Sequence, residues 1–195
     1  MKNFLTVSFT SFLFSSVLWI IWAFFLLQGD DNYKLLGPLL YYPHAARVLC
    51  IVYFGYRAIP ALFLAEIWGP LLLFPEVFNF YPYVPSIISV MSVPMAIITL
   101  EFFGFKLGST RDSPLNKTNY KHVALITVMS AFYNALVKNL SLSLLEVNYQ
   151  EGLVDILQVC QFLIGDILGT TIVLILLAMI LRPILKSTHQ ESRIH

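Results

Sequence analysis

Apolar residues fill six long stretches of this sequence, and short polar segments separate them. The stretches cover residues 5–27, 38–55, 58–75, 83–103, 122–145 and 158–182. A helix needs about 20 predominantly apolar residues to cross the hydrocarbon of a bilayer. Charged residues make up only 12% of the chain, against about 25% in soluble domains. We therefore predict an all-α, polytopic membrane bundle of about six transmembrane helices. It forms one integral membrane domain, residues 1–195, with a short tail at 183–195.

Charge in the connecting segments predicts the orientation. The segments expected on one side carry six acids and a single lysine: Asp30, Asp31, Glu76, Glu146, Glu151, Asp155 and Lys34. The opposite side carries Lys2, Arg57, Lys106, Arg111, Lys117, Lys121, Arg182, Lys186 and Arg193. Basic residues accumulate on the cytoplasmic side of membrane proteins. Both termini are therefore expected in the cytoplasm. Spans 38–55 and 58–75 are expected to form a tight hairpin, because only a short turn joins them.

Several polar residues fall inside the predicted spans rather than between them. An ionisable group at mid-membrane costs about 2.5–3.5 kcal/mol on insertion scales, so such groups pair, face the bundle interior or line a wet cavity. Counting 1.5 Å per residue places Arg47, Glu66, Lys138 and Asp166 between the midplane and the outer third. Two are basic and two acidic. The candidate ligand-binding residues are His44, Arg47, Glu66, Asn134, Lys138 and Asp166.

Two interpretations of these residues stay open. Arg47 with Glu66, or Lys138 with Asp166, could be internal ion pairs that only fix the register of the helices. Alternatively, the group could line a polar pocket that opens to the outside and binds a small ligand or ion. His44 is expected near the outer interface, where an ordinary water-exposed histidine is the simpler interpretation.

No pattern in the sequence indicates catalysis. There is no HExxH, GxSxG, P-loop or paired-carboxylate motif, and Cys50 and Cys160 cannot form a zinc motif alone. We expect no enzyme activity, no cofactor and no metal. A net charge of +1 gives no indication of nucleic acid as a partner. The lipid bilayer is the partner that the composition implies, in a multi-pass protein of the bacterial inner membrane.

Four segments together resemble MASE-type integral membrane sensor domains. They are "YYPHAARVLCIVYFGYRAIPALFLAE", "TLEFFGFKLG", "MSAFYNALVKNLSL" and "FLIGDILGTTIVLILLAMILRP". The matching positions are Pro43, Phe54, Gly55, Arg57, Pro60, Phe63, Leu64, Leu100, Glu101, Gly165, Asp166 and Gly169. Gly165 and Gly169 also have the small-xxx-small spacing that lets helices approach closely. His44 and Arg47 depart from the family pattern, which more often has a small residue there.

The resemblance implies a membrane sensory or regulatory module. Such domains usually precede a cytoplasmic diguanylate cyclase or histidine kinase, whereas only a short tail follows Pro183 here. We therefore expect this sensor to signal through a separate cyclase-type or kinase-type protein or another membrane subunit, with homo-oligomers also open. Two alternatives fit the same features. One is the substrate-binding membrane subunit of a small-molecule transporter, and the other is a membrane assembly or scaffold protein.

Overall fold

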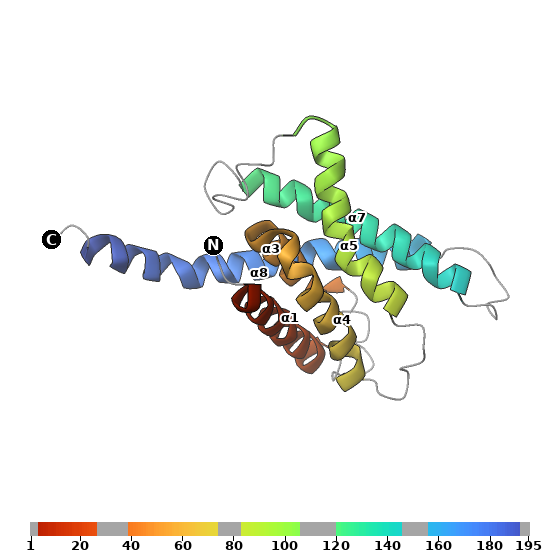
Figure 1. The fold of residues 1–195 in the computed structure, drawn as a ribbon, viewed down its shortest axis with the longest axis horizontal. Helices are drawn as coiled ribbons and strands as arrows, with labels where there is room; N and C mark the ends of the chain where they lie inside the picture. Colours follow the sequence, from red (N-terminus) through yellow and green to blue (C-terminus); the bar gives the residue numbers. More distant parts are fainter. Residues whose placement is uncertain (1–3, 27–38, 74–82, 106–119, 146–155, 192–195) are drawn as a thin grey trace.

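A computed structural model describes residues 4–26, 39–73, 83–105, 120–145 and 156–191. These residues form helices and no strand. The helices are α1 (Phe4–Leu26), α3 (Pro43–Phe54), α4 (Ile59–Leu73), α5 (Tyr83–Phe102), α7 (Tyr120–Leu145) and α8 (Ile156–Glu191), with the 3-10 turn η2 (Gly55–Ala58) between α3 and α4. Figure 1 shows α3 at the centre, α5 and α7 crossing beside it, and α1 and α4 on the opposite side.

Four helical stretches in the described part are long and apolar enough to cross a membrane. They are Phe4–Phe24, Pro43–Gly69, Tyr83–Phe102 and Ile156–Ile180. This agrees with the prediction of an all-helical membrane protein. α7 has 26 residues, which is sufficient length, but it is not among these four. The segments that carry most of the predicted loop charges, such as residues 106–119 and 146–155, lie outside the described residues.

The predicted span 38–55 is wrong at its start. Leu40, Tyr41 and Tyr42 are not helical, and α3 begins at Pro43. Proline suits the first turn of a helix because its missing N–H would have no helical partner there. α3 consequently has only 12 residues, or about 18 Å of helix.

α3 and α4 are separate helices because the backbone turns at Gly55. This residue has φ 67°, a left-handed conformation that glycine adopts at little cost. An ion pair between Arg47 and Glu66 confirms that the chain doubles back, since about 28 Å would separate these residues along one straight helix. The two short helices therefore fold against each other as a splayed hairpin.

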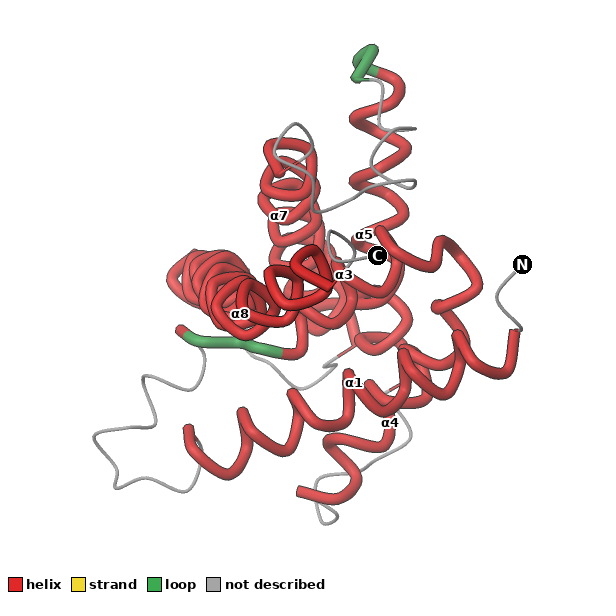
Figure 2. The backbone as a smooth tube through the Cα atoms, turned by 90° about the vertical axis from the view of Figure 1, so that its left-hand side faces the viewer, coloured by secondary structure: helices red, strands yellow, loops and turns green. Residues whose placement is uncertain are grey.

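α3 is the core of the molecule. It contacts α1, α4, α5, α7 and α8, and all residues from Pro43 to Val52 are buried. The end-on view in Figure 2 shows α8 beside α3, while α1 and α4 run together below them. Any polar residue on α3 must therefore find its partners on neighbouring helices.

α8 is the longest helix and extends past the other helices at its C-terminal end (Figure 1). Near that end its large apolar side chains are exposed, with Ile175 at 54%, Met179 at 66% and Ile180 at 60%. The first half of α8 is different, because Gly165, Asp166, Gly169 and Thr170 are buried. One helix thus joins the interior of the bundle to a region outside it.

Candidate functional site: a buried polar cluster

Polar side chains from four helices meet inside the bundle around α3. We call His44, Arg47, Glu66, Ser130, Asn134 and Asp166 the polar cluster. Five of these six residues are 0% exposed and Glu66 is 3% exposed. Five of the six candidate ligand-binding residues predicted from sequence are therefore brought together, from helices far apart along the chain.

Arg47 connects α3 to two neighbouring helices. Its Nε lies 3.3 Å from Oε1 of Glu66 on α4. Its Nη1 donates a hydrogen bond of 2.9 Å to the backbone carbonyl of Ser89 on α5. Truncating one partner of such a buried pair typically costs about 3–5 kcal/mol, because the other charge is left uncompensated. Arg47 thus fixes α4 and α5 relative to α3.

Tyr41 completes the surroundings of the Arg47–Glu66 pair. The guanidinium carbon of Arg47 lies 5.3 Å from the centroid of the Tyr41 ring, which is within cation–π range. The Tyr41 ring and the Glu66 carboxylate are therefore both neighbours of the same guanidinium. On its other side the ring packs edge-on against Trp19 and Trp22 of α1, with centroids 5.7 and 5.1 Å away. Tyr41 therefore connects the polar cluster to α1.

His44, Ser130, Asn134 and Asp166 form the other half of the cluster. His44 Nε2 lies 3.0 Å from the Ser130 hydroxyl on α7. His44 Nδ1 lies 3.5 Å from Oδ2 of Asp166 on α8. The same oxygen accepts a 2.6 Å hydrogen bond from the Asn134 amide nitrogen on α7. α3, α7 and α8 consequently meet at a single carboxylate oxygen.

The expectation of a water-exposed His44 is wrong. Its side chain is fully enclosed, because the chain before α3 is held against α8. The Tyr41 backbone N–H donates to the Gly165 carbonyl at 3.0 Å, which carries the start of α3 into the bundle. One helical turn later on α8, a Cβ atom on Gly169 would meet the Tyr41 backbone at 2.5 Å. The Gly165 carbonyl thus pairs the irregular stretch of chain before α3, and Gly169 leaves room for it.

Lys138 lies beside the polar cluster, half-buried. Its Nζ is 5.2 Å from the centroid of the Phe162 ring on α8. The pairing of Lys138 with Asp166 stays a prediction, while the structure places His44 Nδ1 3.5 Å from the Asp166 carboxylate. Counting residues along a helix axis gives the depth of a side chain in the membrane. It does not give the rotation of the helix about that axis, which determines the partner that the side chain faces.

Several buried atoms around the cluster have no hydrogen-bond partner among the described residues. They are Nε and Nη2 of Arg47, Nδ1 of His44, Oε1 of Glu66, Oδ1 of Asn134, Oδ1 of Asp166, Oγ of Ser89 and Oγ1 of Thr170. Nearly all buried polar atoms in native proteins are satisfied, so exceptions call for a functional explanation. Apart from Nε of Arg47 and Oε1 of Glu66, which face each other at 3.3 Å, these are donors and acceptors that a ligand or ion could use.

Sequence reasoning missed Tyr41, Ser89, Ser130 and Thr170. Spacing gave a signal for two of them. Ser130 precedes Asn134 by four residues, and Thr170 follows Asp166 by four, so each pair shares a helix face. Ser89 acts through its backbone carbonyl, which no side-chain pattern can reveal. Tyr41 lies before the helix, where periodicity does not apply.

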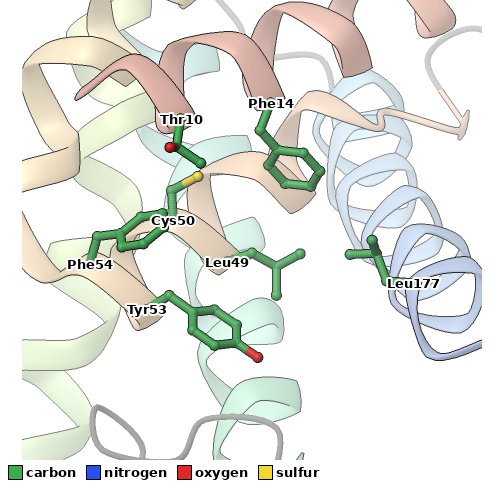
Figure 3. Close-up of a pocket in the computed structure, with 7 residues that line it drawn as sticks. All are labelled: Thr10, Phe14, Leu49, Cys50, Tyr53, Phe54 and Leu177. Carbon is green, nitrogen blue, oxygen red and sulfur yellow. The ribbon is translucent and has the colours of Figure 1, made fainter. Parts of the chain in front are cut away.

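A second, apolar feature lies at the other end of α3. It is a hollow of about 460 Å³ between α1, α3 and α8 (Figure 3), which we call the apolar hollow. Its lining residues are Thr10, Phe14, Leu49, Cys50, Tyr53, Phe54 and Leu177. None of them is charged, so the hollow can accommodate hydrocarbon but offers little for orienting a polar molecule.

No protein-family model, curated protein or solved structure matches the chain. The site must therefore be interpreted from its own chemistry. Among the described residues, no group of three or more His, Cys, Asp and Glu side chains is placed to hold a metal ion. What the geometry offers is a set of enclosed charges and hydrogen bonds that joins α3 to its neighbours.

Proposed function

We propose that this protein is a multi-pass membrane sensory or regulatory module that binds a small ligand or ion at the polar cluster. The proposal includes six spans with both termini in the cytoplasm, within one domain over residues 1–195 in the bacterial inner membrane. A separate protein, of the cyclase or kinase type or another membrane subunit, would receive the signal. The likeness to MASE-type sensors supports this proposal through the sequence motifs alone.

The observation that carries the proposal is the path of α8. Asp166 contributes to the polar cluster, and the same helix continues to Glu191, about 37 Å further along its axis. A ligand can shift a conformational equilibrium only by binding two arrangements with different affinity. A change in the contacts of Asp166 would alter how α8 is held, and α8 extends beyond the other helices (Figure 1).

The test is site-specific photo-crosslinking in native membranes. One photoreactive residue replaces Ile180 on α8, and a matched one replaces Ile98 on α5. The two side chains are almost equally exposed, at 60% and 59%. We expect a signalling protein to be captured from position 180 and not from position 98, and we expect D166N to reduce that capture. Recovery of an ATPase with a coupling subunit would instead support transport.

The assembly alternative is favoured by one observation, which is that Arg47 and Glu66 pair directly with each other. It predicts that both R47A and D166N lower the abundance of the protein in the membrane. The sensor proposal predicts that D166N accumulates normally while capture at position 180 is lost. Equal loss of abundance and capture in both variants would therefore contradict the sensor proposal.

A further inference from the structure

The hydrogen bonds around His44 determine which ring nitrogen carries hydrogen. Ser130 donates its only hydroxyl hydrogen to the Thr127 carbonyl at 3.1 Å. The same hydroxyl lies 3.0 Å from His44 Nε2, so toward His44 it can only accept. With Ser130 bonded in this way, the hydrogen of a neutral His44 ring lies on Nε2.

The opposite nitrogen, Nδ1, then faces a carboxylate. In a neutral imidazole with hydrogen on Nε2, Nδ1 carries a lone pair. This lone pair points toward Oδ2 of Asp166 at 3.5 Å, and Nδ1 has no hydrogen-bond partner among the described residues. Two acceptors facing each other in an enclosed site repel. One proton on Nδ1 would turn that contact into a charge-assisted hydrogen bond.

We propose that His44 Nδ1 and Asp166 Oδ2 form a proton-binding site, and that the proton is the ligand to which the protein responds. This inference rests on the proposed function and names the ligand of the same site. The lone pair of Nδ1 takes up the proton, and the new N–H donates to Oδ2. Charge-assisted N–H···O bonds are about 2.7–2.9 Å long, so proton binding draws α3 and α8 together.

The other titratable and charged groups around this pair come from each packed element. They are Arg47 on α3, Glu66 on α4, Lys138 on α7 and Tyr41 before α3. α5 presents the backbone carbonyl of Ser89 to Arg47, and α1 contains no titratable side chain. A measured titration must therefore be assigned to His44 itself rather than to the cluster as a whole.

The test is nitrogen-15 NMR of the histidine rings in the full-length purified protein, held in lipid nanodiscs between about pH 5 and about pH 9. The H44Q variant identifies the His44 signal among the four histidines. We expect Nε2 to carry hydrogen at every pH, and Nδ1 to gain a proton as the pH falls. In D166N the proton affinity of Nδ1 should fall at least about tenfold, because the adjacent negative charge is gone. E101Q, which removes an exposed carboxylate on α5, should change that affinity less than about twofold.

The wild-type protein alone can overturn the inference, even where D166N does not fold. A neutral His44 with its hydrogen on Nδ1, or an Nδ1 that never takes up a proton across this range, contradicts it. The measurement needs no partner protein, so its failure is separable from failure of the proposed function. Proton binding without crosslinked capture would reject the sensor proposal and support the proton-binding site. Crosslinked capture without proton binding would support the sensor proposal and reject the proton-binding site.

Discussion

The two ends of α3 present opposite solutions to packing a helix inside a membrane bundle. At its N-terminal end, His44 and Arg47 contact specific atoms on α4, α5, α7 and α8. At its C-terminal end, Leu49, Cys50, Tyr53 and Phe54 line the apolar hollow. Both ends belong to one 12-residue helix, so helix propensity cannot explain the difference.

The difference shows where specificity comes from when the solvent is lipid. Apolar side chains gain little from packing on one another in a membrane, because lipid tails are equally apolar. The hollow can therefore persist, since hydrocarbon from the surroundings can fill it. An enclosed arginine or aspartate has no such substitute and must meet its partner. The polar end consequently determines how the helices are arranged, and the apolar end tolerates variation.

Breaking the Arg47–Glu66 pair should produce the largest effect. R47A or E66A alone should lower the free energy of unfolding by about 3–5 kcal/mol, because one buried charge is left without its partner. The double variant R47M/E66M should recover at least half of that loss. Unfolding by SDS in mixed micelles measures the free energy of unfolding of all three variants. The control is R57M at an exposed arginine, with an expected change below about 0.5 kcal/mol. A single variant costing less than the control would refute this account of the polar end.

G169A should have the next largest effect, about 1–3 kcal/mol, because overpacking forces the backbone to move. The added Cβ would meet backbone atoms of Tyr41 at 2.5 Å. G169V, with two further methyl groups at the same place, should cost more than G169A. The same unfolding assay compares both variants with the unsubstituted protein. A G169A protein as stable as the unsubstituted one would show that the Tyr41 backbone is not fixed.

Truncation at the apolar hollow should have the smallest effect. L177A should cost less than about 1 kcal/mol, because lipid can enter the enlarged space. The identical substitution L62A, at a leucine that is 0% exposed on α4, should cost about 2–5 kcal/mol. SDS unfolding measures the free energy of unfolding of both variants and so compares packing at the apolar hollow with packing in the buried core. If both lose the same stability, the hollow is closed to lipid.

The sequence allowed the depth of the charged residues to be predicted but not their pairing. Counting residues along regular helices brought Arg47, Glu66, Lys138 and Asp166 to a similar depth. That count works because the helical rise is constant. It could not show that Asp166 meets His44 and Asn134, because rotation about the helix axis depends on packing. Helices that are apolar on all sides carry no sequence signal for that rotation.

The start of α3 was the other point where sequence reasoning failed. A continuous apolar run over residues 38–55 looks the same whether or not it is helical throughout. The backbone bond from Tyr41 to Gly165 depends on a residue more than a hundred positions away. Only the assembled fold brings these two segments together. The burial of His44 follows from that contact, so it could not be predicted either.

The Tyr41–Gly165 bond also allows the central helix to be short. Non-helical backbone is tolerated at membrane depth only where the protein or a water-filled cavity satisfies its polar groups. The bond satisfies the Tyr41 N–H at 3.0 Å, so α3 can begin as late as Pro43. A helix of 12 residues covers about 12 Å less than a 30 Å hydrocarbon layer. α3 therefore depends on α8, through the Gly165 carbonyl, to satisfy backbone that a longer helix would satisfy within itself.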